Sequence, residues 1–66
     1  MLKKIVFPNI EAERLKVGMS KNDLSAVIGI TPRSYYNYTR GVAPIPSKIL
    51  LKLSSVFQCS IDYLLS

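Results

Sequence analysis

Residues 21–41, KNDLSAVIGITPRSYYNYTRG, decide the fold of this chain. Ser20, directly before them, predicts a helix start, because a serine hydroxyl accepts a hydrogen bond from a free backbone amide of the first turn. The Asp23 carboxylate is placed to accept a bond from the Ser20 amide in return, which completes a capping box. Gly29 predicts the end of this helix, since glycine enters the left-handed conformation at little steric cost.

This first predicted helix is expected to bury one apolar stripe. Leu24, Val27 and Ile28 recur at spacings of three and four residues, which places them near one another on a helix surface. The small side chain of Ser25 allows a neighbouring backbone to come close. The helix should therefore pack tightly against the next element.

A second helix is predicted to begin at Thr31. A threonine is a good N-cap, and Pro32 falls in the first turn, where its missing N–H does no harm. Since the preceding helix has only just ended at Gly29, the chain must turn sharply between the two. The stretch is therefore predicted to form a helix–turn–helix unit.

The second predicted helix has two different faces at about 100° of rotation per residue. One face carries Ser34, Tyr35 and Tyr38, and the other carries Arg33, Tyr36, Asn37 and Arg40. The second face presents guanidinium, amide and phenol groups and no acid. Such a face suits the DNA major groove, where arginine pairs with guanine and asparagine with adenine. An ordinary solvated helix face is the alternative, and the tight corner in a basic chain favours DNA.

The order and spacing of these residues resemble the helix–turn–helix of the Cro/phage-repressor (XRE-type) DNA-binding domains. The positions that carry the resemblance are Gly18, Met19, Ser20, Leu24, Gly29, Ile30, Thr31, Tyr35, Tyr38, Arg40 and Gly41, followed by residues 50–53 and 60–65. The resemblance covers residues 9–65. It implies an all-α fold, a five-helix repressor-like domain that binds operator DNA as a homodimer with helix 31–40 in the major groove.

The remaining helices are predicted from caps, glycines and apolar spacing. A first helix is expected over residues 9–17, with Asn9 as its cap and Gly18 as its stop. A fourth helix is expected over residues 46–57, and a fifth begins after Ser60. The apolar side chains expected to close the core from these last two helices are Leu50, Leu53, Phe57, Ile61, Leu64 and Leu65.

Three polar side chains are expected to reach partners from within the fold. Arg14 matches a family arginine that commonly pairs with a glutamate two residues before Gly41, a place that holds Thr39 here. Another acceptor is therefore expected for Arg14: a carboxylate, a helix-end carbonyl or solvent. Tyr35 and Tyr38 are expected to pack their rings inside while their oxygens reach the surface.

The charge of the chain favours a polyanionic partner. Nine lysines and arginines oppose four acids, which gives a net charge of +5. Between Asp23 and Asp62 the sequence contains basic residues and no acid. Basic small proteins are common, so this placement is more informative than the net charge.

The single cysteine is typical of a reducing compartment, and the short apolar run at the start of the chain does not predict secretion or a membrane span. The single cysteine, Cys59, rules out an internal disulfide framework and is interpreted as a small buried residue. Pro8 and Asn9 end the first apolar run too early for a signal peptide or a membrane span. We therefore expect a cytoplasmic protein without a membrane partner.

The sequence does not favour an enzyme. It has no histidine and one cysteine, and its four acids all lie in predicted first turns, where capping and dipole effects explain them. No pair has the spacing of a nucleophile with its base or of a metal cage. We expect no catalytic residue, no metal, no cofactor and no small-molecule ligand.

The expected DNA contacts divide into base readers and phosphate contacts. Arg33, Tyr36 and Asn37 are expected to read bases, and Lys21, Thr31, Arg40 and Lys48 are expected to contact phosphates. In the related family the position of Lys21 often holds glutamine and approaches the DNA backbone. The position of Pro32 often carries a base-reading polar side chain there, so that part of the readout must come from elsewhere.

The chain is predicted to form one helix–turn–helix domain, residues 9–66, after an N-terminal arm, residues 1–8. An arm packed on its own domain is the favoured interpretation. Pairing with the same segment of a second subunit, and delivery of lysines to phosphate, are the alternatives. Leu51 and Ile45 are the candidate dimer contacts, because Leu51 is an apolar residue off the predicted core stripe and is expected to lie near Ile45.

Together these features predict a sequence-specific regulator of transcription, of the phage or prokaryotic repressor type. A homodimer would place two recognition helices roughly 34 Å apart on a palindromic operator. A protein-interaction module on the same scaffold, such as an antitoxin or a partner of another regulator, is the alternative.

Overall fold

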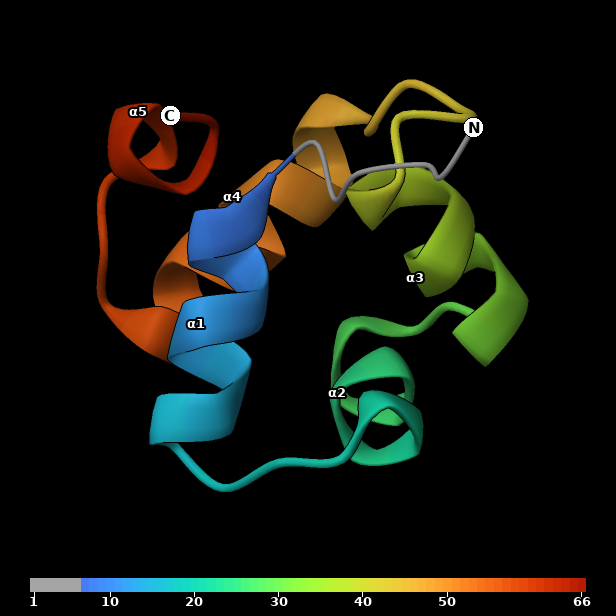
Figure 1. Cartoon of the computed structure of the whole chain (residues 1–66), viewed down its shortest axis with the longest axis horizontal. Coiled ribbons are helices and arrows are strands. Elements are labelled where there is room, and N and C mark those ends of the chain that lie inside the picture. Colours follow the sequence, from blue (N-terminus) through green and yellow to red (C-terminus); the bar gives the residue numbers. More distant parts are fainter. Residues whose placement is uncertain (1–6) are drawn as a thin grey trace.

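The computed structural model describes residues 7–66, and these residues form five helices and no strand (Figure 1). The helices are α1 (Pro8–Lys16), α2 (Lys21–Ile28), α3 (Pro32–Thr39), α4 (Ser47–Phe57) and α5 (Ile61–Leu64). This confirms the predicted five-helix all-α fold. The roles suggested for the N-terminal arm fall largely on residues 1–6, which lie outside the described residues.

The helix–turn–helix unit forms as its caps predict. The Ser20 hydroxyl accepts a hydrogen bond from the Asp23 amide at 2.9 Å, and the Asp23 carboxylate accepts one from the Ser20 amide at 3.4 Å. Gly29 ends α2 with φ of 78°, in the left-handed region. The Thr31 hydroxyl then accepts a bond from the Ser34 amide at 3.1 Å and so caps α3. Local side-chain chemistry therefore sets the boundaries of both helices.

The start of α1 differs from the prediction. The helix begins at Pro8, and Phe7 in the cap position makes no side-chain hydrogen bond to it. Asn9 lies inside the helix and donates to the Tyr63 carbonyl at 2.7 Å, which ties α1 to α5. The prediction of Asn9 as a cap was wrong because Pro8, with φ already suited to a first turn, starts the helix by itself.

The core lies where α1, α4 and α5 meet the helix–turn–helix unit. In Figure 1, α2 and α3 occupy one end of the molecule and α5 the other, with α1 and α4 between them. Helix α1 contacts α3, α4 and α5, and α2 contacts α3 and α4. The buried hydrophobic side chains are Ile10, Leu24, Ile28, Tyr35, Ile49, Leu53, Phe57 and Leu64.

Four residues predicted to face the core, among them the half-buried Ile61 of α5, do not do so fully. Val27 is 56% exposed, because α2 packs through Leu24, Ser25 and Ile28 and turns Val27 away from this stripe. Leu65 follows the end of α5 and is exposed, and Leu50 is only half-buried at the edge of the α4 stripe. Each lies within one helical turn of a buried residue, so the spacing was right and the packing angle decided the outcome.

Cys59 is half-buried rather than buried and packs against the core. Its thiol donates to the Phe57 carbonyl at 3.3 Å, and burial raises the pKa of the thiol. A raised pKa disfavours the reactive thiolate, which fits a packing role. Among residues 7–66, none of the helices is long and apolar enough to cross a membrane.

Candidate nucleic-acid interface

The exposed face of α3 carries three of the residues predicted to contact DNA. Arg33 is exposed and Tyr36 is 46% exposed, whereas Asn37 is half-buried. The first turn of α3 contains no acid. The Asn37 backbone carbonyl accepts bonds from the amides of Val42 and Ala43, which fixes the chain as it leaves the helix. The predicted base readers therefore reach the surface to different extents, with Arg33 and Tyr36 the most accessible.

An open groove of about 560 Å³ lies on this face and is lined by residues of both α2 and α3. Its lining residues are Lys21, Asn22, Pro32, Arg33 and Tyr36. Lys21, predicted to contact phosphate, thus lies beside Arg33 and Tyr36, which come from the other helix. Asn22 was missed by sequence reasoning. Its position next to Lys21, at the exposed start of α2, is the signal that could have found it.

Arg40 is held against Tyr36. The guanidinium carbon of Arg40 lies 5.2 Å from the centre of the Tyr36 ring, a cation–π geometry. The Arg40 Nε is buried and has no hydrogen-bond partner among residues 7–66. Arg40 as a whole is half-buried, and its guanidinium lies against the Tyr36 ring.

The other predicted phosphate contacts lie outside the groove. Thr31 is exposed, but its hydroxyl is engaged with Ser34, accepting from the amide and donating to the hydroxyl oxygen at 3.0 Å. Lys48 is exposed in the first turn of α4. Lys52, which was not assigned a role, donates to the Ile28 carbonyl at 3.4 Å and so satisfies the end of α2. Of the four basic residues between Asp23 and Asp62, Lys52 is therefore engaged in packing α4 against α2.

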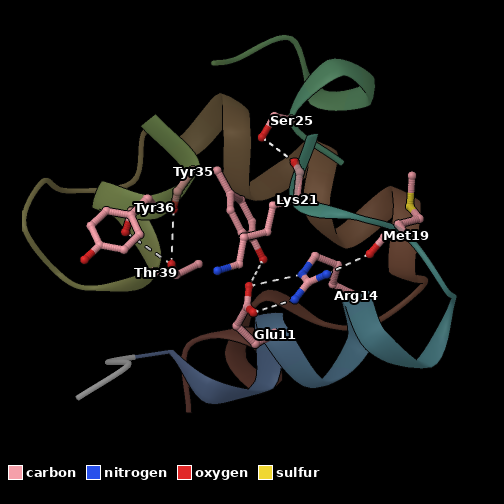
Figure 2. Close-up of polar contacts among 8 residues, drawn as sticks. All are labelled: Glu11, Arg14, Met19, Lys21, Ser25, Tyr35, Tyr36 and Thr39. Atoms are coloured by element: carbon pink, nitrogen blue, oxygen red, sulfur yellow. Dashed lines mark hydrogen bonds and ion pairs between the residues drawn. The ribbon is translucent and has the colours of Figure 1, made fainter. Parts of the chain in front are cut away.

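The inner side of α3 is tied to α1 by a buried polar network (Figure 2). Tyr35 is 1% exposed and its hydroxyl donates to the Glu11 carboxylate. Arg14 pairs with the same carboxylate at 2.8 Å and donates to the Met19 carbonyl at 2.8 Å. Arg14 therefore finds a carboxylate, as one of the predicted alternatives, and also a carbonyl in the turn before α2.

Sequence reasoning placed the Tyr35 oxygen at the surface, and this was wrong. Glu11 supplies the buried acceptor, so the ring and its oxygen both stay inside. Tyr38 is half-buried and packs against the core. The hydroxyl of Thr39, where the related family commonly has glutamate, lies 3.2 Å from the carbonyls of Tyr35 and Tyr36 in its own helix.

The network shifts the protonation of its members. Burial alone would raise the pKa of Glu11, but the bonds from Arg14 and Tyr35 and the nearby charge of Lys21 hold it below its ordinary value. Burial, and then the bond to Glu11, raise the pKa of the Tyr35 phenol. Near neutral pH the network is therefore an ionised carboxylate between a guanidinium and a neutral phenol.

The two candidate dimer contacts lie in different surroundings. Leu51 is 63% exposed on α4. Ile45 is half-buried and lines a second open groove of about 550 Å³. Apolar or small residues form this groove: Phe7, Gly41, Val42, Ala43, Pro44, Ile45, Leu50 and Leu65. Sequence reasoning missed Val42 and Leu65 as surface residues, although an apolar residue in a loop between helices, as at Val42, was a signal.

Comparison with known proteins agrees with this architecture. A solved structure with a similar fold is the DNA-binding domain of the P22 C2 repressor, determined by nuclear magnetic resonance in solution. It is 28% identical in sequence, the match covers 100% of this chain and 92% of that chain, and the TM-score is 0.77. No curated protein matches the chain. The family model for the helix-turn-helix matches residues 10–64, nearly the whole length, and the chain therefore belongs to the helix-turn-helix family, of the Cro/C1 type.

Proposed function

We propose that this protein is a sequence-specific regulator of transcription that binds double-stranded DNA and inserts α3 into the major groove. The observation that carries the proposal is the groove in which Lys21, Arg33 and Tyr36 meet on the acid-free face of α3. A short helix with exposed cationic and amide side chains fits the width and the hydrogen-bonding edges of the major groove. The similarity to the DNA-binding domain of the P22 C2 repressor supports both DNA as the ligand and repression as the outcome.

The side chains divide between base reading and phosphate binding according to reach and chemistry. Arg33, Tyr36 and the half-buried Asn37, which share the outer face of α3, read base edges. Lys21 at the start of α2 and Lys48 at the start of α4 contact phosphates as flexible point charges. Arg40 contributes charge from beside Tyr36. Thr31 contacts phosphate at the start of α3, where the Arg33 amide stays available because Pro32 has no N–H and the Ser34 amide donates to Thr31.

The active form is a homodimer on an operator with two-fold symmetry. Recognition helices that bind successive major grooves lie roughly 34 Å apart. The described part of the chain has extents of 33 × 23 × 23 Å, a size comparable with that spacing, so two copies on successive grooves would be neighbours on the DNA. Leu51 and the groove around Ile45 offer apolar surface for this contact. The proposed DNA partner fits a cytoplasmic protein of the phage or prokaryotic type, and this role requires no enzymatic step.

Selection of bound sites from random double-stranded DNA tests the proposal. The full chain should enrich one motif with two-fold symmetry and half-sites about one helical turn apart. Arg33→Ala should cost about 1–3 kcal/mol and relax the motif at particular base pairs, since a bidentate base contact is lost. Lys16→Ala, which removes an exposed cation at the end of α1, is the matched control and should leave the motif unchanged.

Failure to enrich any motif would contradict sequence-specific binding. Retention of a protein partner from a lysate, together with equal and weak binding to all DNA sequences, would instead favour a protein-interaction module on this scaffold. The apolar groove around Ile45 would then be the surface to examine for the partner contact.

A further inference from the structure

The apolar groove around Ile45 is bordered by Phe7, the first residue that the structure describes. Its other lining residues come from the loop after α3, from α4 and from the residue after α5: Gly41, Val42, Ala43, Pro44, Ile45, Leu50 and Leu65. Among these described residues, none carries a polar or charged side chain. The groove therefore suits aliphatic side chains and presents no side-chain donor to a phosphate or a base edge.

The backbone of Phe7 fixes the point from which residues 1–6 start. The Phe7 amide donates to the Thr39 carbonyl at the end of α3, at 3.4 Å, and the Phe7 carbonyl accepts from the Ile10 amide at 3.2 Å. The peptide bond between residues 6 and 7 therefore lies beside the end of α3, where Gly41 and Val42 begin the wall of the groove.

The reach of residues 1–6 keeps them near this groove. Six extended residues span at most about 20 Å, at about 3.3–3.6 Å per residue. The two shorter extents of the described chain are 23 Å each. A segment that starts at the edge of the groove can therefore lie along it, but it cannot cross the molecule to a distant surface.

Residues 1–6, MLKKIV, supply side chains of the kind that the groove suits. Leu2, Ile5 and Val6 are apolar, and burial of such side chains is favourable in proportion to the area removed from water. Lysine side chains, as at positions 3 and 4, keep their charged ends in water while their neighbours pack. A short tether also gives the segment an effective concentration on the order of millimolar, far above that of a second copy in dilute solution.

We propose that Ile5 and Val6 dock in the apolar groove of their own chain, and that residues 1–6 thereby restrain dimerisation. Ile45 and its neighbours also belong to the surface offered to a second subunit, so the segment and the second subunit compete for the same side chains. The docking does not depend on DNA, whereas the competition rests on the proposed function, in which this face forms the dimer. On an operator, DNA holds two copies side by side, and the second subunit then displaces the segment.

Nuclear Overhauser effects between methyl groups of the isotope-labelled full chain test the docking. Cross-peaks are expected between the methyl groups of Ile5 or Val6 and those of Val42, Ile45 or Leu65. In a sample that mixes labelled and unlabelled chains, isotope filtering should show none of these cross-peaks between different chains. Their absence from the labelled protein, or their appearance between chains only, would overturn the docking. This measurement uses the unmodified protein, so it does not depend on whether a variant folds.

Substitution of the docking side chains tests the restraint on dimerisation. Ile5→Ser combined with Val6→Ser should lower the dimer dissociation constant by at least about fivefold, because the groove is free in only a minority of unmodified chains. Lys3→Ser combined with Lys4→Ser is the matched control. In high salt, where repulsion between charges is screened, this control should change the constant by less than about twofold.

Sedimentation equilibrium over a range of concentrations measures both constants. A dissociation constant that stays the same or rises in the Ile5→Ser and Val6→Ser protein, or a variant that stays monomeric at every concentration, would overturn the restraint. Site selection from random DNA separates this inference from the proposed function. A missing motif would contradict the proposed function and leave the docking result standing, whereas missing cross-peaks would overturn the docking and leave a selected motif standing.

Discussion

Tyr35 on α3 donates its hydroxyl hydrogen to Glu11 on α1, across 24 residues of sequence. The carboxylate is also paired with Arg14, so a charged hydrogen bond inside the fold connects the first helix to the inner side of α3. Tyr36, the next residue, points to the opposite side and lines the groove. The bond at Tyr35 therefore helps to set the rotation of α3 that places Tyr36 and Arg33 outward.

Removal of the Tyr35 hydroxyl should destabilise the protein. Tyr35→Phe keeps the buried ring and leaves Glu11 with one donor fewer, so the free energy of unfolding should fall by about 1.5–3 kcal/mol, the range for hydrogen bonds to charged groups. Urea denaturation followed by circular dichroism measures this loss. Tyr38→Phe, a half-buried tyrosine of the same helix outside the Glu11 network, should change stability by less than about 0.5 kcal/mol. Equal losses from both variants would argue against a special role for the Tyr35–Glu11 bond.

Glu11 should make stability depend on pH in the acid range. Its pKa in the folded protein lies below the ordinary value of 4.5, so the folded state binds fewer protons than the unfolded state there. The stabilisation is present above the unfolded pKa and is lost as the pH falls through the folded pKa. Glu11→Gln should therefore reduce the free energy of unfolding most at neutral pH, with the difference from the unmodified protein shrinking in the acid range. Unfolding curves at several pH values with a constant difference between the two proteins would rule this out.

Lys21 and Asn37 should affect DNA binding in different ways. Lys21→Ala should weaken binding to all sequences similarly and reduce the slope of log affinity against log salt by about one, because one phosphate contact is lost. Asn37→Ala should cost about 1–3 kcal/mol on the selected site and relax particular base pairs. Fluorescence anisotropy on the selected and a scrambled site, over a range of salt, separates the two. A uniform loss from Asn37→Ala across sites would count against its role in base reading.

A charge in the proposed dimer surface should favour the monomer. Val42→Glu, beside Ile45 in the apolar groove, and Leu51→Glu should each raise the dimer dissociation constant by at least about tenfold, since an unpaired carboxylate is costly to bury. Leu15→Glu is the matched control, because Leu15 is 67% exposed on α1 and outside both surfaces. Sedimentation velocity with and without operator DNA measures the effect. Loss of dimers only with Leu15→Glu would place the interface on α1.

The helix–turn–helix unit was predictable because its signals are local. Ser20, Thr31 and Ser60 each accept a hydrogen bond from an amide in the helix that follows, and Gly29 ends α2 through a backbone conformation that favours glycine. These interactions join atoms only a few residues apart. The sequence alone therefore determined where α2, α3 and α5 begin, and the outward and inward faces of α3 follow from its periodicity.

Packing decided the features that join distant residues. Arg14 had several possible acceptors, and only the approach of α1 to α3 brings Glu11 between Arg14 and Tyr35. The groove that combines Lys21 with Tyr36, and the exposure of Val27, likewise depend on the angle at which α2 meets its neighbours. A helix crossing angle is set by many weak contacts among side chains on several elements. For that reason the boundaries of the helix–turn–helix unit can be derived from sequence, whereas the geometry of its DNA-facing groove required the tertiary structure.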